Sequence, residues 1–423
     1  MRRRDFVLAA QLPPLTGLRG VAAYAVLFAH AFNFSGVSSP SLTALAYFGM
    51  SLFFTLSGFV IQYNYGLSFA SKGIKAASKH FLLARFARLY PLYLVGLILS
   101  ASFIGMGFLK DILPALSCIT LTQTWFNLEG ATGDIIAGSW SISTEFFLYL
   151  FFIPLAAPIS RITRPLPWLI ALCIAALIVV LLIGAFRDSV TTSLGFLQLR
   201  DPKVSAPPFY WLMYFSPLIR CFEFFGGALA ARFYQSASKP RCKSRSASIV
   251  VFSCVAWCVL VILLLCRAGN QIIETLLPNF IFAPAIITIL IVVCRFKTDL
   301  TRLMSSPLML NAGKISYSVY LLQALVFVAV ANAFDRSISS AIARSSYAIL
   351  ITTALGYGVY HLFESPARQW IRSLPKRFTR ETARMSPEPF NRCSLGTGNG
   401  EHQEKESAGD SRVLVAASSQ MRK

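Results

Sequence analysis

Long apolar stretches recur along the chain, separated by short polar segments. About ten windows of roughly 20 residues carry few charged side chains. The windows cover residues 15–35, 44–65, 88–108, 139–158, 166–186, 212–233, 247–266, 276–294, 313–333 and 343–363. A helix of about 20 apolar residues is long enough to cross the hydrocarbon core of a bilayer. The pattern therefore predicts an all-α polytopic membrane protein with about ten transmembrane helices.

Composition supports this fold class and distinguishes a polar C-terminal segment from the apolar remainder of the chain. Hydrophobic residues make up 55% of the chain and charged residues 13%, and the mean hydropathy is +0.61. Such values exclude an ordinary soluble domain. From residue 379 to 423 the sequence becomes polar and poor in aromatic residues. We expect a membrane domain over residues 1–378, followed by a disordered polar cytoplasmic tail.

The net charge of +21 indicates membrane topology rather than a nucleic-acid partner. Basic residues gather in every second connecting segment, whereas acidic residues balance the bases of the intervening segments. The basic segments lie near residues 2–4, 72–88, 161–164, 239–245, 295–302 and 368–380. By the positive-inside rule, both termini are expected in the cytoplasm. A cleaved signal peptide is the alternative interpretation of the first apolar window, but Arg19 within that window argues against it.

The cysteines carry no metal-binding signature. Nine cysteines lie mostly in apolar segments, and none of them forms a CxxC pair. They are interpreted as small core residues, and no metal site is expected.

Arg19 and His30 both lie in the first apolar window, where ionisable side chains are costly and therefore usually functional. Eleven residues separate them, so a helix would place both on one face, about 16 Å apart along its axis. Between them that face carries Ala22, Ala23 and Val26. These small residues predict a slot for a ligand or for a tightly packed partner helix. In the alternative interpretation, Arg19 snorkels to the lipid headgroups and His30 only packs between helices.

Other ionisable residues fall into two groups by predicted depth. His30, Glu145, Arg220 and Glu223 are expected in the outer half of the membrane, paired around a shared cavity because isolated charges there are costly. Arg85-x-x-Arg88 lies at the cytoplasmic start of the third window. Two guanidinium groups on one helix side suit phosphate recognition. The alternative is that both arginines are positive-inside anchors.

Seven short motifs occur in order along the chain. They are Leu15-Thr16-Gly17-Leu18-Arg19-Gly20 with His30; Phe53-Phe54 with Ser57-Gly58; Arg85-x-x-Arg88 with Tyr90-Pro91; Ser139-Trp140-Ser141-Ile142-Ser143-Thr144-Glu145 with Tyr149; Arg220-x-x-Glu223-Phe224; Ser316-Tyr317 with Tyr320-Leu321; and Glu364-x-Pro366 with Arg368. Over roughly residues 12–372 this set resembles the acyltransferase-3 family of membrane acyltransferases, such as bacterial O-antigen and exopolysaccharide O-acetyltransferases. Two positions depart from the family pattern: Phe146 replaces a common second acid, and Gln323 stands where many relatives have histidine.

The resemblance implies a ten-helix core in a bacterial inner membrane and transfer of an acyl group, by default acetyl, from acyl-coenzyme A to a carbohydrate hydroxyl. Acetyl-coenzyme A would be a substrate, and no permanently bound cofactor is implied. The positions of Arg19 and His30 would be functional. The expected substrate-binding residues are Arg220, Glu223, Ser141, Trp140 and Tyr317.

As a mechanistic hypothesis, His30 acts as general base on the acceptor hydroxyl, and Glu145 orients it. Arg85 and Arg88 hold the donor phosphates, while Arg19 lines the route of the donor arm toward His30. Arg220 or Ser141 would assist the oxyanion or position the acceptor.

Two other classes use buried ionisable residues in similar ways. A secondary transporter or flippase of a glycan or lipid-linked substrate would show inverted repeats or interrupted helices, and the sequence shows neither. In a scaffold protein the same residues would only bind helices together. The sequence specifies neither the acceptor glycan nor the oligomeric state.

Overall fold

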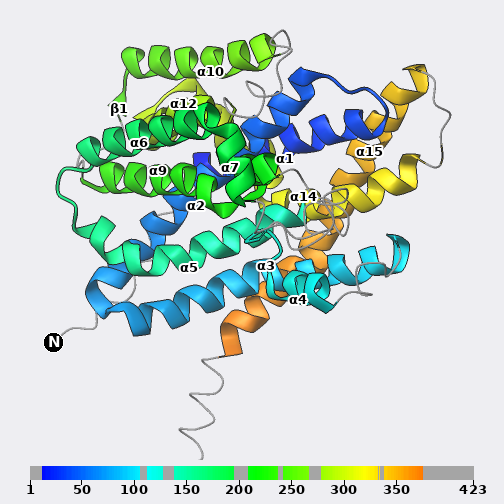
Figure 1. Cartoon of the computed structure of the whole chain (residues 1–423), viewed down its shortest axis with the longest axis horizontal. Helices are drawn as coiled ribbons and strands as arrows, with labels where there is room; N and C mark the ends of the chain where they lie inside the picture. Colours follow the sequence, from blue (N-terminus) through cyan, green and yellow to red (C-terminus); the bar gives the residue numbers. More distant parts are fainter. Residues whose placement is uncertain are drawn as a thin grey trace, which may run out of the picture. The chain divides into compact units, whose positions relative to one another are not determined.

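The computed structural model describes residues 12–104, 112–126, 138–194, 208–236, 242–265, 278–331, 333 and 338–374. Within these ranges the chain is almost entirely helical (Figure 1). The all-α prediction is therefore confirmed. The predicted polar tail lies outside the described residues.

Each predicted apolar window overlaps a long helix. These helices are α1 (Pro13–Phe34), α2 (Pro40–Lys72), α3 (Ile74–Ile104), α5 (Ser139–Arg161), α6 (Pro165–Ala185), α9 (Pro217–Ser236), α10 (Arg245–Leu265), α12 (Pro278–Arg295), α14 (Pro307–Ala331) and α15 (Ile338–Val359). In the described part of the chain, seven helices are long and apolar enough to span a bilayer: α1, α2, α3, α5, α6, α10 and α14. A count of ten spans and the cytoplasmic position of both termini remain predictions.

Short elements connect or extend these helices. They are α4 (Ile112–Thr120), α7 (Arg187–Leu194), α8 (Pro208–Tyr210), the π-helix η3 (Trp211–Phe215), β1 (Cys242–Lys243), β2 (Phe296–Lys297), α13 (Asp299–Met304) and the π-helix η4 (Tyr360–Glu364). Strands β1 and β2 pair in parallel, with Lys243 opposite Lys297. The hydropathy pattern predicted neither π-helix. Single π-helical turns often occur at functional sites, and η4 ends at a residue of the site described below.

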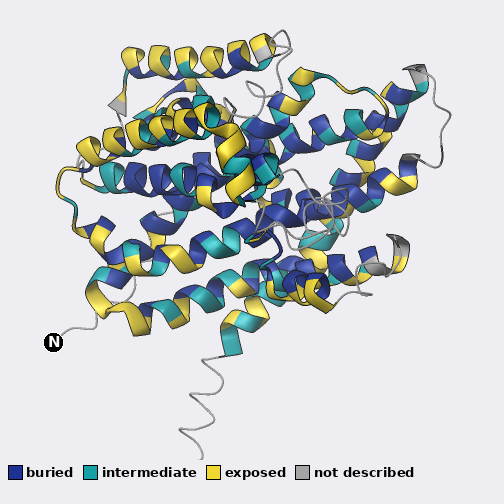
Figure 2. Ribbon diagram, in the orientation of Figure 1, coloured by how far each residue is buried: buried dark blue, intermediate teal, exposed yellow. Residues whose placement is uncertain are grey.

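Helix α2 is central, whereas α6 and α10 are peripheral. The apolar window of α2 is 72% buried, compared with 17% in α6 and 22% in α10. Most of α10 is coloured as exposed in Figure 2. Mean hydropathies of 3.0 and 2.8 make α6 and α10 unsuited to contact with water on all sides. The apolar surfaces of α6 and α10 therefore face lipid, whereas α2 packs against other helices on most of its surface.

Glycines allow α2 and α9 to pack backbone against backbone. A Cβ atom added to Gly58 would lie 1.8 Å from the carbonyl oxygen of Phe224, and one added to Gly227 would lie 1.9 Å from that of Thr55. No side chain fits at such distances. Reciprocal small residues of this kind bring membrane helices together where lipid offers no hydrophobic driving force.

Gly227→Ala is expected to destabilise the fold, because the added methyl group must push α9 away from α2. Overpacking of this kind costs about 1–3 kcal/mol. Thermal unfolding of the purified protein in detergent measures the effect. Gly358→Ala on α15 is the matched control, since nothing lies within 4 Å of its added Cβ. Equal unfolding temperatures for the two variants would contradict the packing argument.

Candidate functional site

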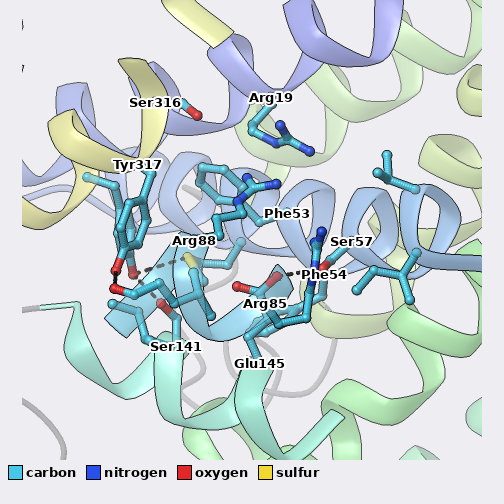
Figure 3. Close-up of a pocket in the computed structure, with 16 residues that line it drawn as sticks. Arg19, Phe53, Phe54, Ser57, Arg85, Arg88, Ser141, Glu145, Ser316 and Tyr317 are labelled. Carbon is cyan, nitrogen blue, oxygen red and sulfur yellow. Dashed lines mark hydrogen bonds between the residues drawn. The ribbon is translucent and has the colours of Figure 1, made fainter. Parts of the chain in front are cut away.

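A pocket lies among α1, α2, α3, α5 and α14, inside the membrane domain (Figure 3). Its free volume is about 60 Å³. Polar and apolar side chains share its walls. The lining residues are Arg19, Met50, Phe53, Phe54, Ser57, Val60, Ile61, Arg85, Arg88, Leu89, Ser141, Ile142, Glu145, Ser316, Tyr317 and Tyr320.

Three arginines from two helices share this pocket with one carboxylate. Arg19 comes from α1, and Arg85 and Arg88 from α3. Arg19 is repelled by the other two guanidinium groups and attracted by Glu145. Three positive charges against one negative charge leave the lining with an excess of two. Such an excess among membrane helices is unfavourable unless an anion binds there.

Arg85 is held mainly by aromatic side chains. Its Nη2 donates a hydrogen bond of 3.3 Å to the Tyr65 hydroxyl. The guanidinium carbon lies 5.3 Å from the centre of the Tyr65 ring and 5.9 Å from that of Tyr149. Its buried Nε makes no hydrogen bond to any residue that the structure describes. Buried donors are normally paired, and Arg220 Nη2, outside this pocket, is unpaired in the same way.

Two hydroxyl groups fix Glu145. The Ser57 Oγ and the Tyr149 hydroxyl each donate to its Oε1, both at 2.5 Å. Ser57 lies on α2, whereas Tyr149 lies one turn further along α5. The carboxylate is thereby oriented before any ligand binds. It forms the negative element of an otherwise cationic wall.

A second carboxylate approaches the arginines from η4. Glu364 is buried and accepts a 2.6 Å hydrogen bond from Ser318. It interacts electrostatically with Arg88, Arg368 and Arg19. The motif Glu364-x-Pro366 contributes to the family resemblance, but the sequence predicts no role for Glu364. Its electrostatic interactions make it part of the arginine network.

Ser141 and Tyr320 form a separate polar pair in the pocket. The Ser141 Oγ lies 2.8 Å from the Tyr320 hydroxyl, and both hydroxyls donate to the Gly138 carbonyl, at 2.9 Å and 3.2 Å. Gly138 has a φ of +98°, which favours glycine. The turn before α5 thus supplies the shared acceptor. Of the predicted substrate-binding residues, Ser141 and Tyr317 line the pocket.

His30 lies outside the lining of this pocket and interacts with the side-chain amide of Gln323. Gln323 follows Tyr320 by three residues on α14, a rise of about 4.5 Å. Neither polar atom of the buried Gln323 amide makes a well-formed hydrogen bond within the described ranges. The partner of His30 thus lies about one helical turn along α14 from Tyr320.

The small-residue face between Arg19 and His30 is filled by a partner helix. A Cβ on Gly49 of α2 would lie 2.6 Å from Val26 Cγ2 and 2.8 Å from the Ala22 carbonyl oxygen. The sequence predicted either a ligand slot or a tightly packed partner helix at this face, and the structure shows the packed helix.

The expected pairing of Glu145 with His30 is not formed. Glu145 lies with the three arginines, whereas Gln323 is the partner of His30 in the described structure. The prediction rested on depth in the membrane, which does not determine the helix face on which a side chain lies. The first residues of α5 are packed among other helices: Ser139, Trp140 and Ser141 are at most 7% exposed. The packing of α5 turns Glu145 toward the arginines.

Arg220 and Glu223 also lie apart from the pocket. Arg220 Nη1 lies 3.1 Å and 3.3 Å from the two oxygens of Glu223, and Arg220 Nε donates to the Tyr214 carbonyl at 3.1 Å. Ser51 donates to Glu223, and the guanidinium carbon lies 5.8 Å from the centre of the Trp140 ring. Arg220 is 0% exposed. The predicted substrate residues Arg220, Glu223 and Trp140 thus form a closed network that joins α2, α5 and α9.

Arg220→Met is expected to lower stability strongly, because it leaves Glu223 buried without its partner. Breaking a buried ion pair costs about 3–5 kcal/mol. Arg302→Met is the control, since its pair with Asp299 is 81% and 93% exposed, and exposed pairs contribute roughly 0–1 kcal/mol. Thermal unfolding compares the two. A stable Arg220→Met protein that fails only to bind acceptor would instead support the substrate-binding role.

This chain is similar to one protein family and to two curated proteins described here. The family model described as acyltransferase domain, Acyl_transf_3, matches residues 14–361. The acyltransferase MdmB of Streptomyces mycarofaciens is 31% identical over 241 residues, which cover 52% of this chain and 57% of MdmB. Protein 2 in the picA locus of Rhizobium radiobacter is 42% identical over 99 residues, 22% of this chain and 49% of that protein.

The chain thus spans about half the length of the curated relatives it matches. No solved structure matches it significantly. The family match covers every residue of the pocket and extends from α1 to η4. The chain therefore belongs to the acyltransferase-domain family, as its motifs predicted.

Proposed function

We propose that the protein is an integral membrane acyltransferase that transfers an acyl group, by default acetyl, from acyl-coenzyme A to a carbohydrate hydroxyl. The observation that carries this proposal is the cluster of Arg19, Arg85 and Arg88 around Glu145 within the helical domain. Membership in the acyltransferase-domain family supports the reaction class. The similarity to a protein named acyltransferase MdmB supports it as well.

The arginine cluster is the proposed site for the phosphates of coenzyme A. These phosphates carry several negative charges and cannot enter hydrocarbon alone. Guanidinium groups bind phosphate with paired hydrogen bonds, and three of them line this pocket. Glu145 and Glu364 would offset part of their positive charge while no phosphate is bound.

The apolar walls of the pocket suit the acyl-bearing arm of the donor. The arginines and the Ser141–Tyr320 pair line the same pocket, together with the apolar side chains of Phe53, Phe54, Val60 and Ile142. These apolar side chains therefore separate the two polar groups only partly. The pocket's free volume of about 60 Å³ is far below the roughly 300–1,000 Å³ of a pocket for a drug-sized ligand. Binding of the arm must therefore displace side chains or separate helices.

We place the chemistry beyond the Ser141–Tyr320 pair, at His30. The His30 imidazole removes the proton of the acceptor hydroxyl, and the oxygen attacks the thioester carbon. The resulting tetrahedral intermediate collapses as its carbon–sulfur bond breaks. The leaving thiolate then takes the proton from the imidazolium, which yields the ester and free coenzyme A.

Polar groups next to this position would assist the reaction. The Ser141 and Tyr320 hydroxyls are the proposed donors to the oxyanion; each has one proton, so each would turn from the Gly138 carbonyl to donate it. The unsatisfied Gln323 amide would position the acceptor hydroxyl or the imidazole. Arg220 is less suited to the oxyanion role, because Glu223 already engages its guanidinium group. Donor phosphates on the basic, cytoplasmic side and His30 further out would deliver the product across a bacterial inner membrane.

Arg85→Gln combined with Arg88→Gln is expected to weaken binding of coenzyme A at least tenfold. Each charge-assisted hydrogen bond contributes about 1.5–3 kcal/mol, and each 1.4 kcal/mol changes affinity about tenfold. Calorimetric titration of the protein in nanodiscs with coenzyme A gives the affinity. Lys75→Gln with Lys79→Gln is the control, because it removes two exposed cations from the same helix. Unchanged affinity in the arginine variant would argue against the phosphate site.

His30→Ala is expected to lower acyl transfer by roughly 10²–10⁴-fold, the contribution of a general base, while leaving coenzyme A affinity unchanged. Transfer from radiolabelled acetyl-coenzyme A to a glycan extract measures the rate. The exposed His361 gives the control variant His361→Ala. Full transfer in His30→Ala would refute the base. Glycan binding by wild type without any acyl transfer would favour a transporter or flippase.

A further inference from the structure

A second polar cavity lies at the start of α10, lined by β1, β2, α10, α13 and their connections, with none of the arginine-pocket residues in its walls. Its volume is about 550 Å³. Its walls consist almost entirely of cationic and hydroxyl side chains. We name it the basic crevice; its lining residues are Lys243, Ser244, Arg245, Ser248, Lys297, Thr298, Asp299, Thr301, Arg302 and Ser305.

The pairing of β1 with β2 brings two lysines together in this crevice. Lys243 and Lys297 are register partners in the parallel pair, and both are exposed. Like charges directly opposite each other in a sheet are destabilising. Arg245 and Arg302 add two more positive charges to the same crevice. An anion bound between the lysines would offset this repulsion.

The crevice contains too little negative charge to neutralise these cations. Asp299 is its acidic residue. Its carboxylate lies 3.6 Å from the Arg302 guanidinium, so it is already engaged. The remaining lining groups are serine and threonine hydroxyls, which can donate to phosphate oxygens. The crevice therefore suits a phosphate-bearing anion.

An exposed apolar stripe continues from the crevice along α10. Ser248, which lines the crevice, is followed on the same helix face by Phe252, Val255 and Val259. These three side chains are 74%, 38% and 50% exposed. A polar cavity that opens onto a lipid-facing apolar stripe matches the two parts of a phospholipid: its phosphate and its acyl chain.

We propose that the basic crevice binds the phosphate headgroup of an anionic phospholipid, with an acyl chain along the Phe252 stripe of α10. The charge pattern of the sequence predicts the cytoplasmic side for both connecting segments of the crevice, and the surface of that leaflet is negative. The lipid would clamp the β1–β2 pair at the start of α10. This site is independent of the acyltransferase reaction.

The test measures lipid binding directly. Native mass spectrometry of the delipidated protein, titrated with phosphatidylglycerol or with phosphatidylcholine, counts bound lipids. We expect preferential binding of one phosphatidylglycerol, weakened about tenfold or more by Lys243→Gln with Lys297→Gln. Lys75→Gln with Lys79→Gln removes the same number of exposed lysines elsewhere and should bind normally. Should the double variant fail to fold, Lys297→Gln alone serves the comparison.

Two results would overturn the proposal. One is equal phosphatidylglycerol binding by the crevice variant, the control variant and wild type, which would mean that the crevice lysines are only solvated charges. The other combines two observations: millimolar inorganic phosphate displaces phosphatidylglycerol, and Phe252→Ser leaves phosphatidylglycerol binding unchanged. Together they would mean a site for free phosphate. Retained preference for the lipid, weakened by Phe252→Ser, supports the lipid site.

Discussion

The arrangement of the domain depends on three half-buried arginine charges among membrane helices. Arg19, Arg85 and Arg88 are costly there unless their charge is compensated. Glu145 and Glu364 supply part of this compensation, and each accepts a hydrogen bond from a serine of another helix, Ser57 and Ser318 respectively. Because Glu145 comes from α5 and Glu364 from η4, the electrostatic requirement ties distant segments to one pocket. The close backbone contacts through glycines keep these helices near enough for the interactions to form.

Two clusters of charged side chains differ in charge balance and in free volume. Arg220 and Glu223 form one ion pair with further bonds from Ser51 and to Tyr214, and the pair is shielded from solvent. The lining of the arginine pocket has surplus positive charge and encloses free volume. Each cluster holds one arginine nitrogen without a hydrogen bond to the described residues, Arg220 Nη2 and Arg85 Nε. Charge balance is therefore what separates the two roles: a neutral buried pair joins helices, whereas surplus positive charge favours an anionic ligand.

The sequence predicted the helices well, because apolar length and basic loops reflect the bilayer directly. It predicted less of the site, because the side chains that meet in a pocket depend on how the helices pack against one another. Predicted depth grouped Glu145 with His30 around a shared cavity, but depth does not determine the helix face, and Glu145 lies with the arginines. The sequence predicts no role for Glu364, because only tertiary packing brings it near Arg88. The sequence correctly predicted that Arg19 and His30 lie on one helix, α1. It left open whether the small residues between them line a ligand slot, and they pack against Gly49 of α2 instead.

The central claim is that one donor molecule extends from the arginines to His30. A cryo-electron microscopy structure of the protein in nanodiscs with a non-hydrolysable acetyl-coenzyme A analogue tests it most directly. The account predicts phosphate density in contact with Arg19, Arg85 and Arg88, and the acetyl group beside His30 and Gln323. Phosphate density away from these arginines, or an arm that ends far from His30, would contradict the account.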